Sequence, residues 1–138
     1  MEKELRIGNW IWRPCCNDQV VEVREDGIIG LDSLRGLISF AELKPIELDY
    51  EILTEIGFRR LEINSFEDVY FYFQNNCAIR LVFKDYCTLI NIDRHCVLND
   101  DHTETIFQNE MMFKGKIDLH TLQNIWQLST NEELEVEL

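Results

Sequence analysis

Short apolar runs alternate with glycines and polar turns over the first forty residues, a pattern typical of short β-strands. Pro14 ends the first run, because proline lacks the N–H group that a strand ladder needs. The segment Glu25-Asp26-Gly27 is a turn sequence between two later runs. The runs occupy residues 5–12, 20–24, 28–31 and 36–40. The spacing predicts a small twisted sheet or a partial SH3-like barrel, a shape that carries no function by itself.

A short helix is predicted over residues 50–56. Pro45 keeps the preceding segment extended, and Asp49 belongs to the residue types that cap helix N-termini. Gly57 follows the last helical position, where glycine accepts the left-handed conformation of a helix end. The apolar positions Ile52, Leu53 and Ile56 fall on one face, and Glu51 and Glu55 fall on the opposite, solvated face.

From residue 59 to residue 115 the apolar period changes to two, which predicts an antiparallel meander in one sheet or in two. Its strands are expected near residues 69–73, 78–83 and 87–92, and a further hairpin is expected to pair 104–107 with 111–115. Both faces of the hairpin 70–83 carry large apolar groups, so one face is expected on the core while a helix or a partner covers part of the other. That second face is a candidate binding surface.

A second helix is predicted after Asp118, with Leu119, Leu122, Ile125 and Trp126 facing the sheet and with Gln123 and Gln127 facing solvent. The sequence Thr130-Asn131-Glu132-Glu133 has the pattern of a capping box that would open a final turn. The acidic tail after it is expected to be solvated and partly frayed.

These elements predict an α+β fold. The length favours one domain over residues 1–138, and the hydrophobic content of 46% is enough to fill a core. Its parts are an N-terminal β unit (1–43), an extended segment and helix (44–58), a β-meander (59–116), and a C-terminal helix with an acidic tail (117–138) packed on the sheet.

Charge limits the classes of partner. Lys and Arg number 13 against 26 Asp and Glu, so the formal net charge is −13. The basic residues are scattered, with no run longer than Arg59-Arg60, and this argues against direct binding of duplex DNA. An acidic surface is attracted to basic grooves of other proteins. Surplus acid is also a common route to solubility, and both interpretations stay open.

Five cysteines include no C-x-x-C pair and their number is odd, so neither a zinc motif nor a complete disulfide framework is predicted. No signal peptide is recognised at residues 1–6, and reduced thiols in the cytoplasm are expected. No apolar run approaches the roughly 20 residues of a membrane-spanning helix.

Two segments carry a family resemblance. The first is 44–48 with Ile52-Leu53 and Gly57-Phe58, and the second is His120-Thr121-Leu122-Gln123-Asn124-Ile125-Trp126. Together they resemble a family of small uncharacterised proteins of phages and prophages, and Asn9-Trp10 and Glu132-Glu133-Leu134 agree with its pattern. The resemblance covers about half of the chain and brings no catalytic residue. It implies an accessory protein of a mobile element.

Small acidic phage proteins resemble, as a class, inhibitors of host defence, including anti-CRISPR proteins that occupy basic channels of their nuclease. This resemblance implies a cytoplasmic protein of a bacterial host that binds a nucleic-acid-handling effector, such as a CRISPR nuclease or its guide-RNA complex. A nuclease displays a basic channel for its nucleic acid, and an acidic protein is steered toward it. The candidate binding carboxylates are Asp85, Asp93, Asp100, Asp101 and Glu104, followed by Glu51 and Glu55. The candidate aromatic anchors are Tyr70, Tyr72 and Tyr86.

No catalytic residue, metal site or cofactor is predicted. His95 and Cys96 are neighbours that point to opposite faces of a strand, so they do not form a nucleophile and base pair. The loop 99–104 gathers Asp100, Asp101 and His102, but it lacks the spacing of an EF-hand or an H-E-x-x-H helix. Two alternatives stay open: a self-associating structural or packaging accessory of a phage, and a metal-dependent enzyme that uses this loop.

Overall fold

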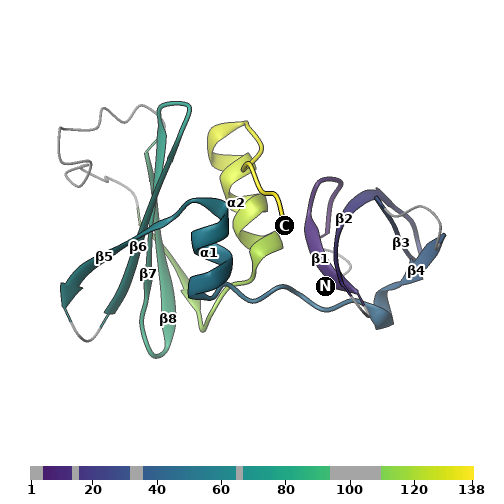
Figure 1. Cartoon of the computed structure of the whole chain (residues 1–138), viewed down its shortest axis with the longest axis horizontal. Coiled ribbons are helices and arrows are strands. Elements are labelled where there is room, and N and C mark those ends of the chain that lie inside the picture. The colour runs from purple at the N-terminus through teal and green to yellow at the C-terminus, as the bar shows by residue number, and fades with distance from the viewer. Residues whose placement is uncertain (1–4, 14–15, 32–35, 65–66, 94–109) are drawn as a thin grey trace.

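Within its described residues the chain forms two antiparallel sheets, of four and five strands, and two α-helices. The structure is a computed structural model that describes residues 5–13, 16–31, 36–64, 67–93 and 110–138 (Figure 1). The predicted α+β class is therefore confirmed. No helix in these ranges is long and apolar enough to cross a bilayer.

The N-terminal sheet has the strand order β1 (Trp10–Arg13), β2 (Cys16–Val23), β3 (Gly27–Gly30) and β4 (Leu37–Ser39), followed by the 3-10 helix η2 (Phe40–Glu42). The first strand begins later than predicted. The Asn9 N–H donates to the Arg6 carbonyl at 3.1 Å, and Gly8 has a φ of +96°, so the chain turns before it enters β1. A small core fills this unit, made of Leu5, Ile11, Val20, Ile28, Ile38 and Leu43. The SH3-like character of the unit stays a prediction.

Helix α1 (Tyr50–Ile56) has the predicted bounds, and both of its end signals act as expected. The Asp49 carboxylate accepts a hydrogen bond from the Ile52 N–H at 2.9 Å. At the other end Gly57 has a φ of +113°, and the Phe58 N–H donates to the Leu53 carbonyl at 2.9 Å. Local capping chemistry therefore sets both limits of this helix.

The second sheet contains β5 (Arg59–Asn64), β6 (Glu67–Gln74), β7 (Cys77–Phe83), β8 (Cys87–Asp93) and β9 (Glu110–Lys114) in that order, so the meander is one sheet. Asn75 and Asn76, with φ of 50° and 64°, form the tight turn between β6 and β7, where asparagine tolerates positive φ. Strand β9 pairs with β8; the predicted hairpin partner of this strand, residues 104–107, lies outside the described residues, so that hairpin stays a prediction.

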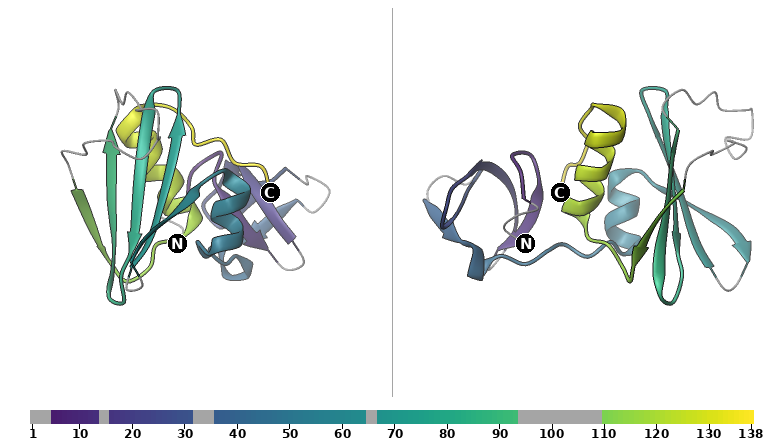
Figure 2. Two further views of the ribbon diagram at one scale, coloured as in Figure 1. Left: turned by 60° about the vertical axis from the view of Figure 1, so that its left-hand side comes forward. Right: turned by 180° about the vertical axis from the view of Figure 1, so that it is seen from behind.

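Both helices lie against one face of this sheet, between it and the N-terminal β unit (Figures 1 and 2). Helix α2 (Leu119–Thr130) contributes Leu119, Leu122 and Trp126, all fully buried, as predicted. The side chains that share this core include Tyr70, Ile79, Leu81 and Ile90 of the sheet and Leu53 of α1. The core thus forms between the five-stranded sheet and the two helices.

The opposite face of the sheet is the candidate binding surface, which was predicted to be covered in part by a helix or a partner. The strand register places Val69, Phe71 and Val82 there, and their exposed fractions are only 2%, 5% and 7%. Met112 of β9 is the exception on this face, with 73% of its surface exposed. Val69, Phe71 and Val82 are therefore closed to a partner, and the role of this face as a binding surface stays a prediction.

Three expectations for the C-terminal region were wrong. Gln123 is 1% exposed and does not face solvent. Helix α2 ends at Thr130, whose hydroxyl donates to the Trp126 carbonyl at 2.7 Å, and Asn131 takes a left-handed cap, so the capping-box pattern opens no further turn. The glutamates of the tail are exposed as predicted, but the tail is not frayed, because Leu134 is buried and the Glu135 N–H donates to Gln74 Oε1 at 3.0 Å.

Candidate functional site

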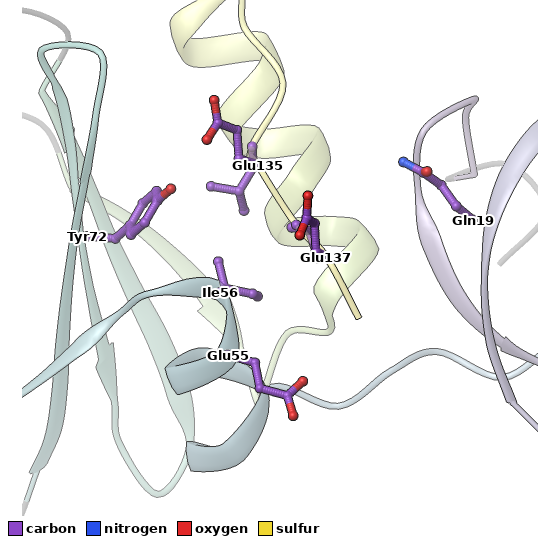
Figure 3. A pocket seen from close by; sticks show the side chains of 8 residues that line it. Gln19, Glu55, Ile56, Tyr72, Glu135 and Glu137 are labelled. Carbon is purple, nitrogen blue, oxygen red and sulfur yellow. The ribbon is translucent and has the colours of Figure 1, made fainter.

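A cleft of about 570 Å³ lies where α1, the C-terminal tail and β2 of the N-terminal unit come together (Figure 3). Its acidic groups are Glu55 of α1 with Glu135 and Glu137 of the tail. Tyr72 of β6 and Gln19 of β2 stand on either side. No lysine, arginine or histidine lines the cleft among the described residues. The cleft is therefore acidic throughout.

Side chains of β6 and β1 hold the tail at the cleft by hydrogen bonds to its backbone carbonyls. The Glu133 carbonyl accepts from Gln74 Nε2 at 2.8 Å, and the Val136 carbonyl accepts from the Trp10 indole N–H at 3.1 Å. Leu134 is 3% exposed, and Val136 and Leu138 pack on the main core. Because apolar residues alternate with glutamates, burying the apolar side leaves the carboxylates of Glu135 and Glu137 exposed.

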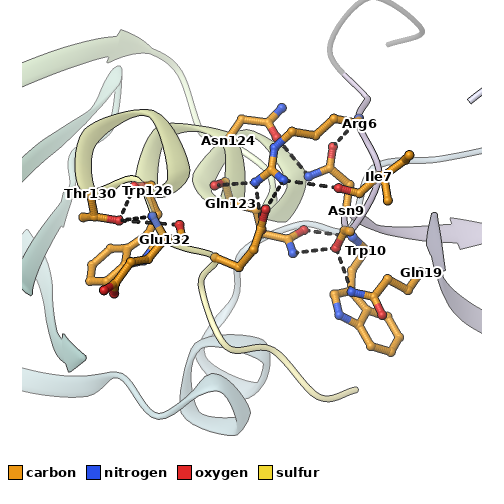
Figure 4. Close-up of polar contacts among 12 residues, drawn as sticks. Arg6, Ile7, Asn9, Trp10, Gln19, Gln123, Asn124, Trp126, Thr130 and Glu132 are labelled. Carbon is orange, nitrogen blue, oxygen red and sulfur yellow. Dashed lines mark hydrogen bonds and ion pairs between the residues drawn. The ribbon is translucent and has the colours of Figure 1, made fainter. Parts of the chain in front are cut away.

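A polar network fixes the N-terminal unit against α2, and so positions β2 at the cleft (Figure 4). The Gln123 side chain accepts from the Trp10 N–H at 2.8 Å and donates to the Gly8 carbonyl at 3.1 Å. Arg6 donates to the Gln123 carbonyl at 3.0 Å and forms an ion pair with Glu133 at 2.6 Å. The amide of Gln123 thus pairs with the edge of β1 much as a neighbouring strand would.

Tyr72 forms a rigid wall of the cleft. Its ring stacks on Phe58 with centroids 5.0 Å apart, and meets Trp126 edge-on at 6.0 Å. Its hydroxyl donates to Gln74 Oε1 at 3.0 Å. Burial raises the pKa of Tyr72, and the nearby Glu135 carboxylate raises it further, so the hydroxyl stays neutral.

The cleft carboxylates differ from other acids of the surface in their partners. Glu133 pairs with Arg6, Glu22 with Arg24 at 2.9 Å, and Asp68 with Arg60 at 2.6 Å. Glu55, Glu135 and Glu137 form no ion pair with any residue in the described ranges. Local negative charge is therefore left uncompensated here, which suits the acceptance of cationic side chains.

The predicted site residues are only partly brought together. Glu55 and Tyr72 meet in the cleft, and Glu51 is exposed one turn earlier on α1. Asp85 and Tyr86 lie in the turn between β7 and β8, at the other end of β7 from the Asn75-Asn76 turn, and Tyr86 is 85% exposed. Half-buried Asp93 ends β8. Asp100, Asp101 and Glu104 lie outside the described residues.

Tyr70 requires a correction as an exposed anchor. It is 5% exposed and packs edge-on against Phe83, with centroids 5.7 Å apart. Its position in the alternating pattern of β6 turns it toward the helices, where the core forms. Its ring is therefore unavailable to a flat partner surface.

The sequence interpretation missed Glu135, Glu137 and Gln19. A signal for the two glutamates was present: Leu134, Val136 and Leu138 alternate with acids, which is the period-two pattern of an extended segment buried on one side. Gln19 carried no such signal, because its place at the cleft depends on how the N-terminal unit docks.

Metal and thiol chemistry receive no support from the described residues. No group of three His, Cys, Asp or Glu side chains there is arranged to hold a metal ion, and Cys16, Cys77 and Cys87 form no disulfide within the described residues. His102 and the pair His95-Cys96 lie outside these ranges. Comparison with known proteins finds no matching family model, no matching curated protein and no matching solved structure. The candidate site is therefore defined by its geometry and charge alone.

Proposed function

We propose that this chain is a non-enzymatic binding protein whose acidic cleft receives basic side chains of a nucleic-acid-handling partner. The observation that carries the proposal is the cleft itself, where Glu55, Glu135 and Glu137 meet without a basic residue among the described lining. The formal net charge of −13 supports it, because a partner with a basic channel attracts such a surface at separations up to about 10 Å at moderate salt.

The fuller proposal is inhibition. The resemblance to small phage proteins suggests a host effector as the target, such as a CRISPR nuclease or its guide-RNA complex in the bacterial cytoplasm. A channel that holds RNA or DNA presents lysines and arginines along its length. In an extended segment alternate residues are about 7 Å apart, so Glu135 and Glu137 offer that channel a short row of anionic groups. Occupying the channel would exclude the nucleic acid.

Two triple variants with equal charge change test the proposal. The cleft variant replaces Glu55, Glu135 and Glu137 with glutamine, and the control replaces three exposed acids of the N-terminal unit, Glu25, Asp26 and Glu42, with their amides. The assay measures affinity for the host effector nuclease and the rate of target cleavage. We expect the cleft variant to lose about tenfold or more in affinity, corresponding to about 1.4 kcal/mol, and the control to change little.

The two variants separate site binding from general charge attraction. Equal weakening of both would assign the effect to net charge and remove the cleft from the interface. A wild-type chain that neither binds the effector at low salt nor slows its cleavage would refute inhibition.

Self-association is the second candidate function, and one observation favours it. Leu128 on the outer side of α2 is 82% exposed, beside an apolar groove of about 410 Å³ lined in part by Leu5 and Ile125. A structural accessory protein would bury such a patch against a second copy. Sedimentation at high salt tests this, because apolar association persists there, and Leu128→Glu is expected to abolish it.

A further inference from the structure

A second cavity, of about 430 Å³, lies at the end of the sheet where both helices begin. It shares no lining residue with the acidic cleft. Its walls include Tyr50 of α1, Arg60 of β5, Asp68 and Tyr70 of β6, and Phe83 of β7. Its volume lies in the range of about 300 to 1,000 Å³ that is usual for ligand sites.

Tyr70 presents an unsatisfied polar group to this cavity. The residue is 5% exposed, yet its hydroxyl makes no hydrogen bond within the described parts of the chain. Burial raises the pKa of Tyr70; Asp68 raises it further, whereas Arg60 lowers it. The hydroxyl therefore stands among the charged groups of the cavity as a neutral donor and acceptor. The side chain is almost fully buried, but its hydroxyl stays accessible from the cavity and has no hydrogen-bond partner in the described parts of the chain, so it can hydrogen-bond a ligand there.

The charged residues that line this cavity indicate whether the ligand is a cation or an anion. The lining holds four carboxylates, on Glu47, Asp49, Asp68 and Asp118, against the two cations Arg60 and Lys116. Arg60 is already paired with Asp68 at 2.6 Å. Each carboxylate has about four acceptor sites, so a carboxylate that already accepts one hydrogen bond within the chain can accept further hydrogen bonds from a ligand. The balance favours a cation.

The aromatic residues of the cavity indicate that the bound cation is planar. Tyr50 is 56% exposed, and with Phe83 it supplies aromatic surface, on which a flat guanidinium stacks better than a compact ammonium. The N-termini of both helices do not favour an anion, because their N-cap residues, Asp49 and Asp118, carry carboxylates that would repel it. We propose that this cavity binds an arginine side chain of the basic partner, a step that rests on the proposed function.

Model amides of single amino acids test this site without the partner. Nα-acetyl-arginine methylamide is titrated into the full isotope-labelled chain, and amide chemical shifts are followed by NMR. The neutral isostere with citrulline and the ammonium analogue with lysine are the matched probes. We expect millimolar binding of the arginine compound with shifts at Tyr50, Tyr70 and Ile117, weaker binding of the lysine compound, and none of the citrulline compound.

Two conservative variants identify the atom involved. Tyr70→Phe keeps the buried ring and removes only a hydroxyl that has no described partner, so the fold is retained, and the affinity for the arginine compound is expected to fall about fivefold. Tyr72→Phe is the control, since its hydroxyl binds Gln74 outside this cavity, and its affinity is expected to be unchanged.

Several outcomes would refute the proposal that this cavity binds an arginine side chain. These are equal binding of the citrulline compound, inorganic phosphate that shifts the same amides, an unchanged affinity in Tyr70→Phe, or no shift at the cavity residues. Failure of the proposed function is distinguishable, because it appears in the nuclease assay with the cleft variant. Arginine binding without nuclease binding would keep the cavity and remove the inhibitor role.

Discussion

Replacement of Gln123 by methionine tests the docking of the N-terminal β unit on α2. Methionine matches glutamine in length and helix propensity, so the change mainly removes the polar atoms of the amide. Two buried hydrogen bonds are lost, one from the Trp10 N–H and one to the Gly8 carbonyl. The variant should therefore weaken the junction while leaving α2 intact.

The two losses differ in size. The Gly8 carbonyl keeps a second hydrogen bond from Gln19 Nε2 at 2.9 Å, so it costs only an ordinary bond, about 0.5–1.5 kcal/mol. The Trp10 N–H has no other partner in the described ranges and would be buried unpaired, at about 1–3 kcal/mol. We expect the free energy of unfolding to fall by the sum of the two losses, about 1.5–4.5 kcal/mol.

Urea unfolding of wild type, Gln123→Met and Gln127→Met measures this change. Gln127 lies one turn further along α2, and in the described parts of the chain its side chain forms no hydrogen bond, so the control should stay within about 0.5 kcal/mol of wild type. A loss for Gln123→Met that equals the control would show that its amide does not stabilise the junction.

Three further changes have expected outcomes. Asp49→Ala removes the cap of α1 and should cost about 1 kcal/mol in urea unfolding, and Asp49→Ser should recover most of it; equal losses would contradict the capping role. Gly57→Ala should lower the melting temperature more than Gly36→Ala, because a Cβ at Gly57 would lie 3.2 Å from the Tyr72 ring and none would be met at Gly36. Burial raises the pKa values of Tyr70 and Tyr72, so the stability due to the neutral phenols is complete below about pH 10 and is lost as pH rises through their folded values. A series of unfolding curves against pH should show a smaller alkaline loss for Tyr70→Phe than for wild type.

Elements with local signals could be predicted from the sequence. The bounds of α1 follow from Asp49 and Gly57, whose effects act within one helical turn. The strands near Val69 and Ile79 follow from period-two alternation together with the intervening Asn75-Asn76 turn. In each case the pattern and the stabilising contact lie in the same short stretch of chain.

Features that depend on distant segments could not be predicted in the same way. Gln123 has the spacing of an outward position, and it is buried only because Trp10, 113 residues away, docks beside it. Tyr70 has the residue type of an anchor, but the helices cover it. The acidic cleft joins four segments far apart in the sequence, so no local pattern encodes it.

The junction between the N-terminal unit and α2 can form only late in synthesis of the chain, because its two sides are far apart in the sequence. Asn9 and Asn124 bond at 2.9 Å across 115 residues of sequence. At about 5–20 residues per second, a ribosome makes residue 9 roughly 6–23 s before residue 124 exists. During that interval the edge of β1 lacks its final covering, and nascent chains are most open to chaperones and to pairing with one another.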